Sequence, residues 1–199
     1  MCILDTHSLT GSFFQPVLDA LRNSDLSDEL KEKVEYQLWT SSLDDTIDMF
    51  AVSDDIAEKM RDAYRNIEVP DGIKSYGDES YIADLSVKKI LVTTGYRKFQ
   101  ETKIAKLGIA QLFDEIIVDE LDFRDRRRGK KKIFQELLDK NNWNKNEVLV
   151  VGDNPMSELG AARSLGMRAV QTLRPTIVKW DGADHHISSF QELGKLINE

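Results

Sequence analysis

The clearest chemical pattern in the sequence is a pair of carboxylates that follows an apolar strand. Residues 148–151 are four apolar, mostly β-branched residues, which predict a strand buried on both faces. Gly152 ends the run, Asp153 follows, and Glu158 comes five residues later, just after Ser157, the predicted cap of the next helix. Two carboxylates at the carboxyl end of a parallel strand suit a hard divalent cation. The alternative is that Asp153 only caps the helix.

Polar side chains also follow two other predicted strands. Asp5 comes directly after residues 2–4, a short apolar strand, and Thr93, Thr94 and Gly95 end another buried strand. Hydroxyls and backbone N–H groups at a strand-to-helix turn can hold an anion. Each pattern is weak alone, because many strands end in Asp and helix capping explains the hydroxyls equally well.

A basic run, residues 124–132, holds seven Lys or Arg and one Asp. Its local charge is +6, whereas the whole chain carries −8. Lys130 follows Gly129 where the next helix begins, so the run could supply a cation for phosphate binding. A solvated loop is the alternative for most of these side chains. A nucleic-acid patch is less favoured, because no aromatic residues interleave with the charges.

The elements that must position these groups alternate as strand and helix from about residue 88 onward. This order predicts an α/β fold, a Rossmann-like parallel sheet with helices on both faces. The carboxyl ends of parallel strands lie at one edge of such a sheet. We therefore expect Asp5, Thr93 and Asp153 to converge on one pocket.

Residues 12–69 show only helical spacing of apolar residues, which predicts an inserted all-α unit. The predicted division is an α/β core of residues 1–11 and 70–199 with a helical domain of residues 12–69. Helix starts are indicated at Pro16, Ser27, Ser42 and Ser53. The aromatic residues of this unit are expected mainly to form its own core, and one or two could face a ligand.

Composition narrows the possible classes of protein. The chain has 199 residues, 41% of them hydrophobic, which is enough for one good core and a small second unit. A net charge of −8 argues against a general nucleic-acid binder. The single cysteine allows no internal disulfide, no apolar run could span a bilayer, and the first residues do not read as a signal peptide. We expect a cytoplasmic protein without nucleic-acid or membrane partners.

Together, the motifs resemble those of the haloacid dehalogenase (HAD) superfamily of hydrolases. Residues 3–5 look like the first motif with its nucleophilic Asp, and residues 91–95 are similar to the second. A Lys that opens the helix after the basic run resembles the third, and residues 152–158 match the acidic fourth. The helical unit at 12–69 corresponds to the small cap that many members insert between the first two motifs.

The resemblance implies a Mg²⁺-dependent phosphatase that acts on a small phosphorylated metabolite. Asp5 would attack phosphorus and form an aspartyl-phosphate. Thr93, beside Thr94, would bind the phosphoryl group, and Lys130 would neutralise its charge. The third-motif cation stays open between Lys130, Lys131 and Arg128, because the usual family spacing leads to Arg128. The implied Mg²⁺ ligands are Asp5, the backbone carbonyl of His7, Asp153 and Glu158, the last directly or through water.

One departure from the family pattern concerns His7. Phosphatases of the family carry a second Asp there as the general acid and base. Three interpretations follow from this difference. His7 could transfer the proton, since an imidazole titrates near pH 6.5. The protein could be a metal-independent dehalogenase-type hydrolase, since those members also lack the second Asp. It could also have lost turnover and bind a phosphorylated ligand or a protein.

Overall fold

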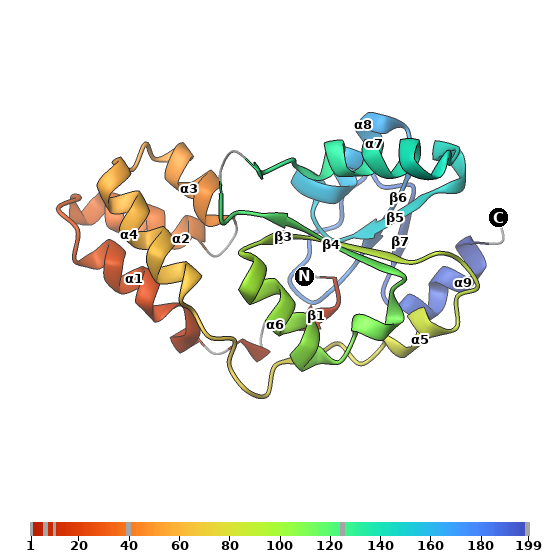
Figure 1. Cartoon of the computed structure of the whole chain (residues 1–199), viewed down its shortest axis with the longest axis horizontal. Coiled ribbons are helices and arrows are strands. Elements are labelled where there is room, and N and C mark those ends of the chain that lie inside the picture. The colour runs from red at the N-terminus through yellow and green to blue at the C-terminus, as the bar shows by residue number, and fades with distance from the viewer. Residues whose placement is uncertain (1, 6–7, 10, 39–40, 124–125, 198–199) are drawn as a thin grey trace.

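The computed structural model describes residues 2–5, 8–9, 11–38, 41–123 and 126–197 (Figure 1). His7, predicted to act in proton transfer and metal binding, lies outside these residues. The chain folds into a helical end and an α/β end (Figure 1).

The helical end contains a 3₁₀ turn and the first helices. They are η2 (Gly11–Phe14), α1 (Gln15–Arg22), α2 (Asp28–Leu38), α3 (Leu43–Met49) and α4 (Asp54–Arg65). Pro16 lies in the first turn of α1, and Ser27 and Ser42 accept bonds from the backbone N–H groups of Leu30 and Asp45. These predicted helix starts are confirmed. Ser53 precedes α4 but makes no side-chain cap bond.

The helices pack around buried apolar residues such as Val17, Leu21, Val34 and Met60. The same cluster includes Phe99 from the α/β part, so the two ends of the molecule share buried contacts. All of α1 to α4 fall within residues 12–69. The division into two domains stays a prediction.

The strands of the described residues form three separate ladders. β3 (Ile90–Gly95) pairs in parallel with β4 (Glu115–Glu120). β5 (Leu149–Gly152), β6 (Arg168–Thr172) and β7 (His185–Ile187) form a second parallel ladder. β1 (Leu4–Asp5) pairs antiparallel with β2 (Lys74–Ser75).

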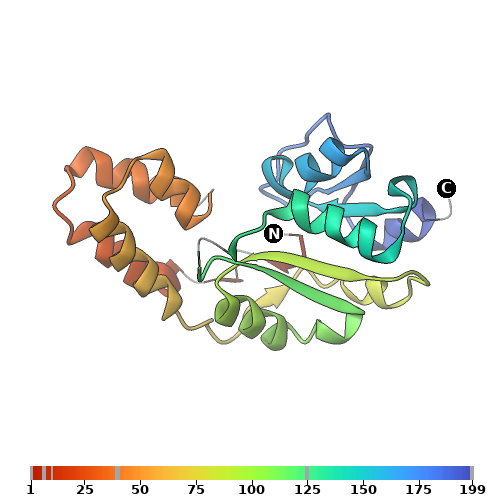
Figure 2. The ribbon, with the colours of Figure 1, turned by 45° about the horizontal axis from the view of Figure 1, so that its top comes forward.

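Helices cover both faces of the strands (Figures 1 and 2). α7 (Lys130–Asn141) and α8 (Gly160–Leu165) lie on one side. α5 (Ser80–Ala83), α6 (Arg97–Leu107) and α9 (Leu193–Leu196) lie on the other. Short connecting turns are η3 (Ala110–Leu112), η5 (Lys145–Glu147), η6 (Pro155–Leu159) and η7 (Phe190–Glu192). The predicted α/β class, with parallel strands and an additional helical part, is confirmed.

The burial predicted for the central strands is wrong in part. Within the described residues, β3 pairs only with β4 and β5 only with β6, and a cavity of about 1750 Å³ is lined by both β3 and β5. Residues 90–92 are therefore half-buried, and Leu149 and Val151 are half-buried while Val150 is buried. A strand reaches full burial only when both of its edges and both faces are covered.

No helix in the described ranges combines the length and the apolar composition that crossing a membrane requires.

Candidate active site

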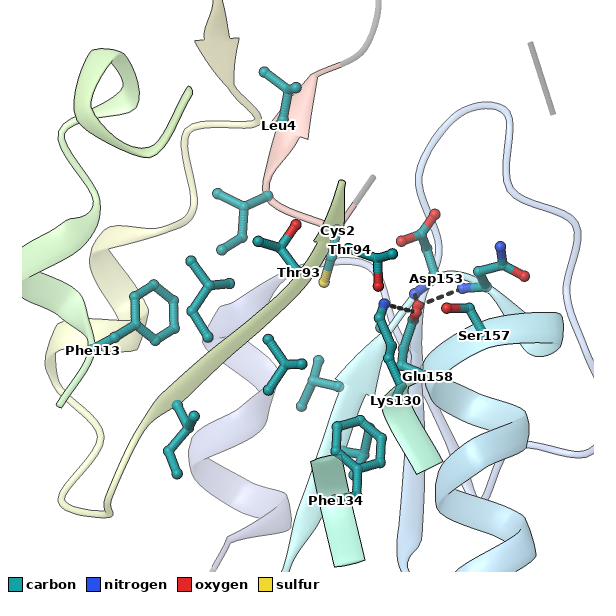
Figure 3. Close-up of a pocket in the computed structure, with 18 of the residues that line it drawn as sticks. Cys2, Leu4, Thr93, Thr94, Phe113, Lys130, Phe134, Asp153, Ser157 and Glu158 are labelled. Atoms are coloured by element: carbon teal, nitrogen blue, oxygen red, sulfur yellow. Dashed lines mark hydrogen bonds and ion pairs between the residues drawn. The ribbon is translucent and has the colours of Figure 1, made fainter. Parts of the chain in front are cut away.

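Residues from several predicted motifs line the end of the cavity where the parallel strands finish. Thr93 and Thr94 come from β3, Lys130 from α7, and Asp153 and Glu158 from the segment after β5 (Figure 3). The tertiary structure thus brings the second, third and fourth predicted motifs to one cavity.

Glu158 accepts hydrogen bonds at both of its carboxylate oxygens. Its Oε1 accepts bonds from the backbone N–H groups of Asp153 at 2.9 Å and Asn154 at 2.8 Å. Its Oε2 lies 2.6 Å from Nζ of Lys130. Burial alone would raise the pKa of Glu158, but Lys130 and the backbone donors outweigh it, so the pKa is lowered and the group is anionic. Glu158 therefore holds the loop after β5 through bonds to two of its backbone N–H groups.

The close approach of Glu158 requires a glycine at position 152. A Cβ placed on Gly152 would lie 2.2 Å from Cγ of Glu158, a distance that no side chain tolerates. This explains why the strand ends in Gly directly before Asp153.

The predicted cap Ser157 is wrong. Ser157 has non-helical angles (φ −122°, ψ −109°) within the π-helical turn η6, and Asn154 caps that turn by accepting from Met156 N–H at 2.8 Å. The regular helix α8 starts only at Gly160 and ends, as expected, at Gly166 in the left-handed region. Within this turn, Glu158 points back toward the N–H groups of its own loop.

The two threonine hydroxyls of β3 point to different partners. Thr93 Oγ1 donates to Oε1 of Gln100 at 3.0 Å, while Nε2 of Gln100 donates to the carbonyl of Thr94 at 3.0 Å. Thr94 Oγ1 lies 3.5 Å from Oδ2 of Asp119. In this arrangement the Thr93 proton is directed to Gln100. The Thr93 hydroxyl must rotate away from Gln100 before it can donate to an anion in the cavity.

Among the three candidate third-motif cations, only Lys130 lines the cavity. Lys131 is exposed on the first turn of α7, and Arg128 is exposed and pairs with Glu136 at 2.9 Å. The other arginines of the described run are also engaged. Arg127 pairs with Asp45 of the helical end at 3.1 Å, and Arg126 stacks on Phe123.

Asp119 is a residue that the sequence reasoning missed. It belongs to β4, is 1% exposed, and accepts bonds from the backbone N–H groups of Arg128 at 2.9 Å and Gly129 at 3.2 Å. The available signal was an acidic residue directly after the apolar residues 116–118, the same pattern that singled out Asp153.

The start of the chain reaches the neighbourhood of the fourth motif. Thr172 Oγ1 lies 3.4 Å from Sγ of Cys2 and 3.1 Å from the carbonyl oxygen of Gly152. Burial raises the pKa of the Cys2 thiol to about 12, and the charges of Asp153 and Glu158 add to this effect. This environment favours the protonated thiol of Cys2.

Asp5 lies at the end of β1, and its backbone carbonyl accepts a bond from Ser8 Oγ at 2.6 Å. Of this first described segment, residues 2–4 line the cavity and Asp5 does not. Among the described residues, no three His, Cys, Asp or Glu side chains lie close enough together to hold a metal ion. The convergence of Asp5 with Thr93 and Asp153 stays a prediction.

The helical end also contributes to the cavity wall. Its lining residues are mainly apolar or aromatic: Phe13, Phe14, Leu38, Leu43 and Tyr64, with Ser41 and Ser42. Some of its aromatic residues thus face the cavity as well as the core, where Tyr64 packs edge-on against Tyr96 and Phe14.

Comparison with known proteins identifies relatives. Residues 1–172 match the family model described as haloacid dehalogenase-like hydrolase. A glyceraldehyde 3-phosphate phosphatase of Pyrococcus abyssi is 30% identical over 89 residues, 45% of this chain and 37% of that protein. The match spans little more than a third of that relative.

Solved structures with the same fold include a HAD phosphatase from Thermococcus onnurineus. It has a TM-score of 0.65 and 25% identity, covering 98% of this chain and 93% of its own. A 2-haloacid dehalogenase from Pseudomonas syringae has a TM-score of 0.56 and 17% identity, covering 99% of this chain and 94% of its own. The matched family model covers most of the sequence, and the chain belongs to the haloacid dehalogenase-like hydrolases.

Proposed function

We propose that the protein is a phosphatase that hydrolyses a small phosphorylated metabolite through an aspartyl-phosphate on Asp5. The supporting observation is that Thr93, Lys130 and Asp153, from three separate elements, line one cavity. The partial match to a phosphatase of Pyrococcus abyssi agrees with this reaction class. We also propose a cytoplasmic setting, without nucleic-acid or membrane partners.

In the proposed reaction, a carboxylate oxygen of Asp5 attacks phosphorus, the P–O bond to the substrate breaks, and the alcohol leaves with a proton from His7. Water then attacks the phosphorus of the aspartyl-phosphate and gives a proton to His7, which releases inorganic phosphate and returns the Asp5 carboxylate. Lys130 offsets the phosphoryl charge, and Thr93 donates a hydrogen bond after turning from Gln100. His7 is the proposed acid and base.

Mg²⁺ is the proposed cofactor. Asp153 lines the cavity, and Oε2 of Glu158 retains acceptor capacity beside Lys130. One or two carboxylates fit Mg²⁺, which usually keeps several waters and takes substrate oxygens as further ligands. Asp5 and the backbone carbonyl of His7 would complete the set. When bound, the ion would reduce the repulsion between carboxylate and phosphate.

The test is phosphate release from a panel of phosphorylated metabolites with Mg²⁺, comparing the wild type with Asp5→Asn. Asp28→Asn, an exposed carboxylate on α2, is the matched control. We expect loss of turnover in Asp5→Asn only. Equal release from the wild type and Asp5→Asn would remove the proposal.

His7 can be tested separately. Replacing it with Asp, the residue usual in the family's phosphatases, is expected to raise kcat and shift the pH profile if proton transfer limits turnover. An unchanged profile would exclude His7 as the acid or base.

A second candidate is a phospho-ligand binding protein without turnover. The observation in its favour is that the hydroxyl of Thr93 and both oxygens of Glu158 already have partners within the protein. Stabilisation by Mg²⁺ with a trigonal phosphate mimic, without any phosphate release, would select this candidate. Chelator-resistant halide release from 2-haloacids would instead select the dehalogenase alternative.

A further inference from the structure

The amino end of α7 is held by a buried carboxylate from another element. Oδ1 of Asp119 accepts from Arg128 N–H at 2.9 Å and from Gly129 N–H at 3.2 Å, and Oδ2 also lies 3.2 Å from Gly129 N. Thr94 Oγ1 approaches Oδ2 at 3.5 Å. One side chain of β4 therefore binds the loop before α7 and contacts the end of β3.

The loop that Asp119 binds is itself unusual in conformation. Gly129 has φ +75°, in the left-handed region that a side chain rarely adopts. In this conformation the successive N–H groups of Arg128 and Gly129 both point at the same carboxylate. These donors are consequently used within the protein, and they tie the backbone just before α7 to β4.

The position of this backbone sets where the side chain of Lys130 begins. Lys130 is the first residue of α7, directly after Gly129, and its Nζ crosses to Oε2 of Glu158 at 2.6 Å. The first turn of α7 has no acidic residue and three lysines, an unfavourable charge for a helix amino end. A buried anion at Asp119 offsets part of that cost.

We propose that Asp119 is a positioning residue that aims Lys130 into the cavity by fixing the backbone of Arg128 and Gly129. Its importance for catalysis rests on the proposed function, whereas the positioning itself does not. Without the carboxylate, the N–H groups lose their acceptor, the loop gains freedom, and Lys130 leaves Glu158 for part of the time.

The first experiment reads the position of Lys130 without any reaction of the enzyme. Lysines are labelled at trace level with an amine-acylating reagent, and mass spectrometry compares Lys130 with the exposed Lys131 on the same helix turn. In the wild type, the ion pair with Glu158 should keep the acylation of Lys130 slow. Asp119→Asn is expected to raise its labelling several-fold relative to Lys131.

The matched control is Asp184→Asn. Asp184 also accepts a backbone N–H, from Ala169 at 2.7 Å, and pairs with Arg163, but it does not line the cavity. This variant should leave the ratio of Lys130 to Lys131 labelling unchanged. A folded Asp119→Asn protein with the wild-type ratio would overturn the proposal. Asp119→Ala serves as the second variant if the Asn protein does not fold.

The second experiment connects the position to function. Asp119→Asn should lower kcat/KM by roughly 10-fold to 100-fold, the usual range when a group that orients a site residue is removed. In a Lys130→Ala background it should add almost nothing, because the side chain that it positions is absent. A fully additive loss would overturn the proposal. If the wild type shows no turnover, the proposed function fails and labelling still decides the role of Asp119.

Discussion

The Lys130 ammonium lies 2.6 Å from a carboxylate oxygen of Glu158, and both side chains are largely buried. This contact joins the first turn of α7 to the loop after β5, two segments 28 residues apart in sequence. It also fixes one cation at the edge of the cavity (Figure 3).

Removing Lys130 should destabilise the fold, because Glu158 would remain as a buried charge without its cation. We expect Lys130→Met to lower the unfolding free energy by about 3–5 kcal/mol, the usual range for breaking a buried pair. The double variant Lys130→Met/Glu158→Gln should recover most of this loss. Urea denaturation of the wild type and these two variants measures the unfolding free energies, and equal stabilities would contradict the expectation.

The Lys130–Glu158 pair should also make the stability of the fold sensitive to acid. Since the pKa of Glu158 is lowered in the folded protein, its stabilising effect is fully present above the ordinary carboxyl pKa of about 4.3. The effect is lost as pH falls through the folded pKa. Wild-type stability should therefore fall more steeply in this acid range than that of Glu158→Gln. Parallel pH profiles of unfolding free energy would refute this.

A side chain at position 95 should displace Gln100, because the Gln100 side chain occupies the space beside Gly95. A Cβ there would lie 2.1 Å from Nε2 of Gln100, and φ is +153°. Gly95→Ala should cost more than about 1–3 kcal/mol and displace the partner of Thr93. Gly77→Ala is the control, since it has positive φ but no atom within 4 Å. Thermal unfolding should show a larger loss of stability in Gly95→Ala than in Gly77→Ala. Equal losses in the two variants would show that only the backbone strain matters.

Lys103 should make stability rise with pH over an alkaline window. Burial lowers the pKa of Lys103 to about 8 from 10.5, so between these values the unfolded chain holds a proton that the folded chain lacks. Unfolding free energy should rise by about 3 kcal/mol across the window. In Lys103→Met this rise should be absent, because the methionine side chain binds no proton. Identical alkaline profiles would show that Lys103 stays charged when folded.

The sequence by itself determined several helix starts, the approximate positions of the longer parallel strands and the order of the motifs. Ser27 and Ser42 cap helices as expected, and Gly166 ends α8, because these features depend on a few neighbouring residues. The strand before Asp153 was likewise found from its apolar run. Local hydrogen bonds and hydrophobic periodicity are properties of short segments, so a single sequence reveals them.

Only the tertiary structure decided which cation faces the cavity, where the threonine hydroxyls point and which carboxylate holds the loop before α7. Lys130, Gln100 and Asp119 take their roles from contacts with residues 7 to 28 positions away. It also showed that β3 and β5 each leave one edge on the cavity, which the apolar runs alone did not indicate. The physical reason is that side-chain direction and strand neighbours depend on how distant segments pack, and no local pattern specifies that packing.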